Sequence, residues 1–169
     1  MYYLFLAAVL SFVAVFTLIS GINGAASIPS PGKIVEEMVD LMGCKKGRVY
    51  YDLGAGGGRI LRKVSQKDAV AIGFEYAPLT YLLAIFFLIL KPNKKVKIFW
   101  KNFYRQNFKN ADGIFCYLSP RAMQLLEPKF TKELKGGASV VTYAFKLPNK
   151  KEEKIIKIKN YAPIYKYKF

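Results

Sequence analysis

Histidine is absent from this 169-residue chain, and cysteine occurs only twice. The absence of histidine excludes a Ser-His-Asp triad, a zinc site with imidazole ligands and histidine-based acid–base catalysis. The two thiols, Cys44 and Cys116, lie far apart in the sequence, and Cys116 falls in an apolar, strand-like run. We therefore interpret them as buried, reduced side chains rather than as a disulfide framework, and we expect no metal site.

Acidic residues are also scarce, because 11 Asp and Glu accompany 27 Lys and Arg and leave a net charge of +16. The excess lies in the second half: residues 1–90 carry 8 basic and 6 acidic side chains, whereas residues 91–169 carry 19 and 5. A field of this sign attracts nucleic acid, phospholipid headgroups or acidic proteins. A generally lysine-rich surface explains the scattered charges equally well, so charge alone assigns no function.

Charged residues are missing altogether from residues 2–19. As a helix this segment would rise about 27 Å, close to the hydrocarbon thickness of a bilayer. A cleaved signal peptide is the alternative, but no basic residue precedes the apolar stretch. The pattern predicts a transmembrane anchor over residues 1–20 and a linker over residues 21–30. Because the positive charge follows the anchor, we expect a single-pass membrane protein with a cytoplasmic catalytic domain.

A second apolar run, residues 77–90, is short for a membrane span and is followed by Lys91, Lys94 and Lys95. Burial in the core of the domain is the favoured interpretation. Contact with the inner leaflet of a membrane is the alternative, because a helix that is apolar on every side has a face to spare.

The remaining residues, 31–169, alternate between strand-like and helix-like segments. Strands are predicted at residues 49–53, 70–75, 96–100, 114–118 and 139–145, and helices at 31–42, 59–64, 77–90 and 121–134. The tail alternates apolar and basic residues at 155–158 and 164–167, which predicts an antiparallel hairpin. The expected fold is therefore one α/β domain, a Rossmann-like and mainly parallel sheet closed by a C-terminal hairpin.

Glycines cluster between the first predicted strand and its helix, in Asp52-Leu53-Gly54-Ala55-Gly56-Gly57-Gly58. At such a junction, glycine lets the backbone approach a ligand closely. The dinucleotide pattern Gly-x-Gly-x-x-Gly fails, because it requires glycine where Arg59 or Leu61 stands, and the P-loop residues Gly-Lys-Ser/Thr are absent. The segment instead has an acid two residues before the first glycine.

This segment resembles motif I of the class I S-adenosylmethionine-dependent methyltransferases. The resemblance implies that Asp52 and the loop residues Gly54, Ala55, Gly56 and Gly58 hold the amino-acid end of the cofactor. Glu75 ends the second predicted strand, 21 residues after Gly54. A carboxylate there can accept hydrogen bonds from both ribose hydroxyls.

Four motifs that contain proline narrow the resemblance: Ile28-Pro29-Ser30-Pro31, Glu75-Tyr76-Ala77-Pro78, Tyr117-Leu118-Ser119-Pro120 and Phe145-Lys146-Leu147-Pro148. In this order they are similar to those of the small protein-lysine methyltransferases of archaea and, with an N-terminal membrane segment, of mitochondria. The resemblance covers residues 28–148 and implies a protein lysine substrate, expected to be membrane-associated.

The chain also departs from that group. Gly57 stands where motif I usually has Asp, and Ser27 replaces an aromatic residue. Asn102, followed by Phe103, stands where an Asp usually reaches the adenine amine; its amide oxygen can still accept a hydrogen bond. We include Asn102 and Phe103 among the cofactor-binding residues. Because of these departures, a non-catalytic cofactor-binding relative remains an alternative.

The third proline motif supplies the predicted catalytic residues Tyr117, Ser119 and Pro120. Tyr117 is predicted to line a channel for the substrate lysine, and Ser119 or a neighbouring carbonyl to accept an amine N–H. Alternatively, Tyr117 is an ordinary core aromatic and Ser119 caps the following helix. A DNA adenine methyltransferase would have Asp/Asn-Pro-Pro-Tyr/Phe here, so nucleic acid is not the expected substrate. Phospholipid or small-amine N-methylation remains a second enzymatic hypothesis, since an anchor and a basic face suit a lipid.

Overall fold

The computed structural model describes residues 1–7, 11, 15 and 30–169; the other residues of the predicted anchor and linker lie outside the described part of the chain. In chain order the elements after the N-terminal segment are α2 (Gly32–Met42), β1 (Val49–Leu53), α3 (Arg59–Ser65), β2 (Val70–Glu75), α4 (Pro78–Leu90), β3 (Val96–Trp100), the 3-10 turn η1 (Phe103–Arg105), β4 (Gly113–Cys116), α5 (Pro120–Glu133), β5 (Ser139–Tyr143), β6 (Lys154–Ile156) and β7 (Ile164–Lys168).

The structure contradicts the prediction of a single-pass membrane protein with a cytoplasmic catalytic domain. Among the residues that the structure describes, no helix is both long and apolar enough to cross a membrane. Residues 2–7 are helical, and the apolar helix α4 has 13 residues, whereas a span needs about 20. The single-pass localisation and the predicted transmembrane helix are therefore withdrawn.

The described strands form one seven-stranded sheet in the order β3-β2-β1-β4-β5-β7-β6. Strands β1 to β5 run parallel, and β7 pairs antiparallel with both β5 and β6. The predicted α/β fold, its mainly parallel sheet and its C-terminal hairpin are confirmed. From β1 the chain adds β2 and then β3 on one side of the sheet, and afterwards β4 and β5 on the other side. The strand order therefore reverses between β1 and β4.

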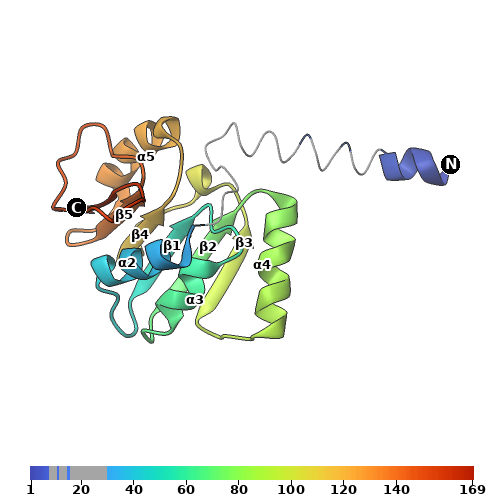
Figure 1. The fold of residues 1–169 in the computed structure, drawn as a ribbon, viewed down its shortest axis with the longest axis horizontal. Coiled ribbons are helices and arrows are strands. Elements are labelled where there is room, and N and C mark those ends of the chain that lie inside the picture. The colour runs from blue at the N-terminus through green and yellow to red at the C-terminus, as the bar shows by residue number, and fades with distance from the viewer. Residues whose placement is uncertain (8–10, 12–14, 16–29) are drawn as a thin grey trace.

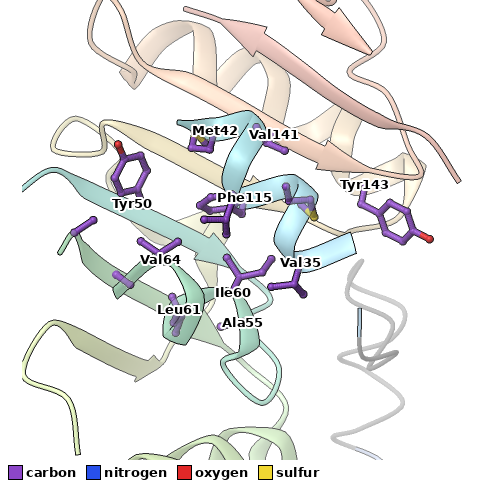
Figure 2. Close-up of a cluster of buried hydrophobic side chains, with 14 of the residues drawn as sticks. Val35, Met42, Tyr50, Ala55, Ile60, Leu61, Val64, Phe115, Val141 and Tyr143 are labelled. Atoms are coloured by element: carbon purple, nitrogen blue, oxygen red, sulfur yellow. The ribbon is translucent and has the colours of Figure 1, made fainter. Parts of the chain in front are cut away.

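Helices cover both faces of this sheet (Figure 1). On one face, α2 and α3 bury Met38 and Val64 against strand residues that include Phe115 and Val141, the cluster drawn in Figure 2. On the other face, α5 buries Met123 and other apolar residues in a second core with strand residues from β1, β4 and β5. Helices cover the central strands on both faces, which explains why every residue of β4 and β5 is buried, including the polar Ser139 and Thr142.

Helix α4 lies along the outer side of β3, at the end of the first helical face (Figure 1). The prediction that this apolar run is buried is wrong, because only Ala77 and Ala84 of residues 77–90 are fully buried. The reason is its position: at the edge of a sheet, one side of a helix meets the strands and no further described element packs on the other. The exposed side is considered further below.

Candidate functional site

The carboxyl ends of β1, β2 and β4 meet where the strand order reverses, the place at which open α/β sheets bind their ligands. The predicted site residues follow these strand ends. They are Asp52, Gly54, Ala55, Gly56 and Gly58 at β1, Glu75 at β2, Asn102 and Phe103 after β3, and Tyr117, Ser119 and Pro120 after β4. The fold thus brings all of the predicted residues to the side of the sheet where the parallel strands have their carboxyl ends.

The glycine loop after β1 has a backbone conformation that residues with a side chain rarely adopt. Gly54, Gly56 and Gly58 have φ of 76°, 54° and 74°, in the left-handed region that favours glycine. The amides of Gly54 and Ala55 donate to the carbonyl of Phe74 over 2.9 and 3.1 Å. The loop therefore folds back onto the end of β2, and its conformation depends on glycine at alternate positions.

Gly73 in β2 allows the loop to lie this close. A Cβ at Gly73 would be 2.6 Å from Leu61 Cδ1 and 2.7 Å from Ala55 Cβ, closer than real Cβ contacts come. By contrast, a Cβ at Gly56 would meet nothing nearer than the Gly54 carbonyl at 4.0 Å. The loop is thus packed tightly underneath and open at Gly56, as a cradle for a ligand would be. The sequence analysis did not assign this packing role to Gly73.

Glu75 is buried and joins the loop to the start of α4. Its Oε2 accepts a hydrogen bond from the Gly56 amide at 2.8 Å, and its Oε1 accepts from the amides of Tyr76 and Ala77, each at 2.8 Å. An ionised carboxyl group offers about four acceptor positions, so three amides leave one for a hydroxyl. In the described structure Glu75 is therefore first of all the residue that shapes the loop.

Asp52 lies one residue before the end of β1, level with Gly73 and Phe115 of the neighbouring strands. Its carboxyl group is buried, and burial, followed by the negative charge of Glu75, raises its pKa to about 8. The neighbouring Cys116 thiol also has a raised pKa, because of burial and the charge of Asp52. The buried position of Asp52 thus favours the protonated form of its carboxyl group.

Asn102 and Phe103 begin the turn η1. The Asn102 Oδ1 accepts from the Tyr104 amide at 2.9 Å, which caps the turn, and its carbonyl accepts from Gln106 Nε2 at 3.0 Å. Phe103 is buried in the second core, with its ring 4.5 Å from that of Tyr104. The described contacts therefore place Asn102 near the end of β3 and give Phe103 a packing role.

Tyr117 directly follows β4, and its half-buried ring lies 4.7 Å from the ring of Tyr143 in β5, inclined by 60°. Tyr143 was not among the predicted site residues, although its place at the end of a strand beside the fourth proline motif was an available signal. Burial raises the pKa of Tyr143, so this hydroxyl stays neutral. The two rings form an aromatic wall at the strand ends.

Ser119 and Pro120 form the N-terminus of α5. The Ser119 Oγ accepts from the Ala122 amide at 3.3 Å, and Pro120 is the first helical residue. This is the helix-capping arrangement that was the alternative to a catalytic serine. A serine hydroxyl keeps a donor and a second acceptor position while it caps, so capping leaves its polar capacity partly unused.

Comparison with known proteins gives one family match. Residues 52–154, more than half of the chain, match the family described as the ANTKMT methyltransferase domain. A protein-lysine N-methyltransferase of Saccharolobus islandicus is 26% identical over 79% of this chain and 84% of its own length. The adenine nucleotide translocase lysine N-methyltransferase of mouse is 31% identical over 68% of this chain.

The chain spans 50% of the length of that mouse relative. Among solved structures, an RNA methyltransferase of Salinibacter ruber in complex with S-adenosyl-L-homocysteine superposes with a TM-score of 0.80. That likeness covers 83% of this chain and 93% of the other at 23% identity. At this level of identity it establishes a shared fold.

Proposed function

Because this chain belongs to the ANTKMT methyltransferase domain family, we propose that it is an S-adenosylmethionine-dependent enzyme that methylates lysine side chains of a protein substrate. The observation that carries the proposal is the glycine loop with its open position at Gly56, fastened by Glu75 at the point where the strand order reverses. The described residues fit the cofactor, which supplies a methyl group on a positively charged sulfur when bound.

The loop from Gly54 to Gly58 and Glu75 are proposed to hold the cofactor. Asn102 is proposed to lie beside the adenine base of the cofactor. The loop amides can face a carboxylate group, and Glu75 keeps an acceptor position for a ribose hydroxyl. Asp52 is proposed to interact with the positively charged end of the cofactor. A positive charge near its carboxyl group would stabilise the ionised form and offset the burial that raises its pKa.

The wall formed by Tyr117 and Tyr143 is proposed to line the path of the substrate lysine. Methyl transfer needs a neutral amine held in line with the reacting methyl group. An apolar, aromatic surrounding disfavours the ammonium form and so lowers the pKa of a lysine. Ser119 is proposed to orient the amine through the polar capacity that its capping bond leaves free, with Pro120 holding the start of α5.

A methyl-transfer assay tests the proposal. Purified protein is incubated with radiolabelled S-adenosylmethionine and a membrane-plus-soluble extract, and label is measured separately in hydrolysed protein and in the lipid fraction. Label recovered as methyl-lysine is the expected result. Recovery in lipid would identify a lipid amine methyltransferase instead, and binding of the cofactor without any transfer would identify a non-catalytic relative; either outcome overturns the lysine assignment.

Replacing Tyr117 by Phe keeps the aromatic wall, whereas replacing it by Ala opens the wall. If the ring lines the lysine path, Tyr117→Phe should retain most of the activity and Tyr117→Ala should lower kcat by about 10-fold or more through misplacement of the amine. Cofactor affinity, measured by calorimetry, should be the same in both variants. Equal activity in the two variants would mean that the ring has only a packing role.

A further inference from the structure

Helix α4 presents a continuous apolar stripe to solvent. Large apolar side chains at helical spacing form it, and we refer to them as the α4 surface: Leu79, Leu82, Leu83, Phe86, Ile89 and Leu90. Each of them is between 48% and 69% exposed. At 100° per residue they fall on one half of the helix. Tyr81, Ala84 and Leu88, on the other half, pack on the sheet. Contiguous apolar patches of this kind mark interaction sites.

The chain segment that carries the α4 surface has charge of one sign, and one of its lysines, Lys95, pairs with Asp68 from another segment. Residues 76–111 contain seven basic side chains and no acidic one: Lys91, Lys94, Lys95, Lys97, Lys101, Arg105 and Lys109. Three of them, at 91, 94 and 97, follow directly on the C-terminal end of α4 or lie in β3 beside it, and all three are exposed. The chemistry that complements apolar side chains bordered by lysines is an apolar layer bordered by negative charge.

Trp100, the single tryptophan of the chain, lies beside this surface at the end of β3. Its ring is 6.2 Å from that of Tyr81 and nearly parallel to it, and its indole Nε1 donates to the Tyr76 carbonyl at 2.9 Å. The indole is 51% exposed. Trp and Tyr are enriched where an apolar layer meets water, because their rings are apolar and their edges polar.

We propose that the α4 surface docks on the surface of a bilayer that contains anionic phospholipids, with the α4 side chains entering the acyl boundary and the lysines facing the headgroups. This is contact with one leaflet and not a membrane span, and it goes beyond the proposed lysine methylation. A second copy of this chain is a poorer occupant, because two such surfaces would bring their lysines together without an acidic residue between them.

The docked orientation would place the candidate site close to the lipid. Trp100 is level with Glu75 in the pairing of β3 with β2, and α4 begins three residues after Glu75. The N-terminal end of the α4 surface therefore lies at the same edge of the sheet as the glycine loop. A lysine presented at the membrane surface would reach this edge first.

The fluorescence of Trp100 tests the proposal with the full chain, because a single indole reports on this surface alone. Vesicles of phosphatidylcholine, with or without phosphatidylserine, are added at low salt, and some contain lipids brominated in the acyl chains. The expected result is a blue shift and bromine quenching with phosphatidylserine, and both should weaken as salt is raised.

The variant Leu82→Gln/Phe86→Gln/Ile89→Gln keeps good helix formers and removes three apolar side chains from the α4 surface. We expect at least about 100-fold weaker vesicle binding, from the lost apolar burial. The matched control, Leu125→Gln/Ile155→Gln/Tyr161→Gln, changes three exposed apolar residues elsewhere and should bind as the wild type does. Circular dichroism of both variants checks that the fold is kept.

Three outcomes would overturn the proposal: Trp100 emission unaffected by anionic vesicles, equal binding by the α4 variant and the control, or an emission shift that depends on protein concentration without lipid. The last result would assign the α4 surface to a second copy of the chain. None of these measurements involves methyl transfer, so failure here leaves the proposed enzyme activity untouched, and the reverse also holds.

Discussion

Glu75 uses most of the hydrogen-bonding capacity of its carboxyl group on the backbone amides of the candidate site. Three amides converge on its two oxygens, so the residue predicted to contact a ligand also determines the shape of the loop around it. The position of this carboxylate at the end of a strand could be predicted from spacing alone. Its three amide partners could not, because they depend on how the loop folds back over β2.

Replacing Glu75 by Gln is the sharpest residue-level test of the loop. The side-chain NH₂ would face at least one backbone amide donor, so the loop would lose its fastening. We expect S-adenosylhomocysteine to bind about 10- to 100-fold more weakly, the cost of one or two unsatisfied hydrogen bonds. Calorimetry measures the affinity. Glu36→Gln, on the exposed side of α2, is the control, and an unchanged affinity in Glu75→Gln would contradict the site assignment.

The buried Asp52 makes a second residue-level prediction, on pH. Its folded-state pKa of about 8 lies above its ordinary value of 3.8, so folding binds a proton between these values. Its contribution to stability is therefore complete below about pH 4 and is lost as pH rises towards 8, with a slope of at most about 1.4 kcal/mol per pH unit.

Urea denaturation of the wild type and of Asp52→Asn measures this contribution. The amide has nearly the same shape and does not titrate, so the variant should lose less stability between about pH 5 and pH 8. Parallel pH profiles of the two proteins would show that Asp52 has an ordinary pKa in the folded state. The sequence predicted a buried strand over residues 49–53, but it did not predict the raised pKa of the acid in that strand.

At the scale of elements, the sequence predicted each described strand and helix from α2 to β7, within a few residues. Buried apolar runs marked the strands, and proline and glycine marked the helix ends. The structure ends β4 at Cys116 and β5 at Tyr143, earlier than predicted, and so frees Tyr117 for the site. The exposure of α4 was missed because hydropathy reports that a segment is apolar and not which of its sides finds a neighbour.

Gly73 is where β2, the glycine loop and α3 meet, and its substitution tests that packing. We expect Gly73→Ala to lower the free energy of unfolding by about 1–3 kcal/mol, because the added methyl overlaps Leu61 and Ala55. Gly136→Ala is the matched control, since a Cβ there meets nothing within 4 Å. The midpoints of urea denaturation of the two variants are compared, provided that the slopes of their transitions are the same. Equal midpoints would show that the loop can move away from β2 at little cost in free energy.

For the whole molecule, carboxyl groups at the two ends of the parallel strands have pKa shifts of opposite sign: the pKa of Asp52, near the carboxyl ends, is raised, and that of Asp112, near the amino ends, is lowered. At the amino edge, burial alone would raise the pKa of Asp112, but hydrogen bonds from Lys135, the Val49 amide and Arg48 outweigh it and lower the pKa. Its Oδ1 lies 2.7 Å from Lys135 Nζ and 3.0 Å from Arg48 Nη1. Stability from Asp112 is thus present above about pH 4 and lost as pH falls below it.

Asp112→Asn should therefore be less stable than the wild type at neutral pH, by about 1–2 kcal/mol from the weakened charged hydrogen bonds. The difference should shrink as the pH falls below about 4 and through the lowered pKa of the wild-type carboxyl group, which then becomes protonated itself. Thermal unfolding at a series of pH values checks both statements. A difference that stays constant at all pH values would show that the charge of Asp112 contributes nothing.

The family and the cofactor class were predictable, because the acid, the glycines and Glu75 stand in one short stretch of the sequence, and the family match confirms the predicted family. What the sequence could not supply is contact between distant segments. Tyr143 lies 26 residues beyond Tyr117 in the printed sequence, and only the pairing of β4 with β5 places their rings together.

Neither native thiol, the partly buried Cys44 nor the buried Cys116, favours its thiolate form at neutral pH. Burial raises the pKa of Cys44 to about 12 and that of Cys116 well above its usual range, and it is the thiolate that reacts. A cysteine engineered at an exposed position would consequently take up a maleimide spin label faster than either native thiol. Two such labels, one on α4 and one on β6, would let distances across the molecule be followed in an otherwise unaltered chain.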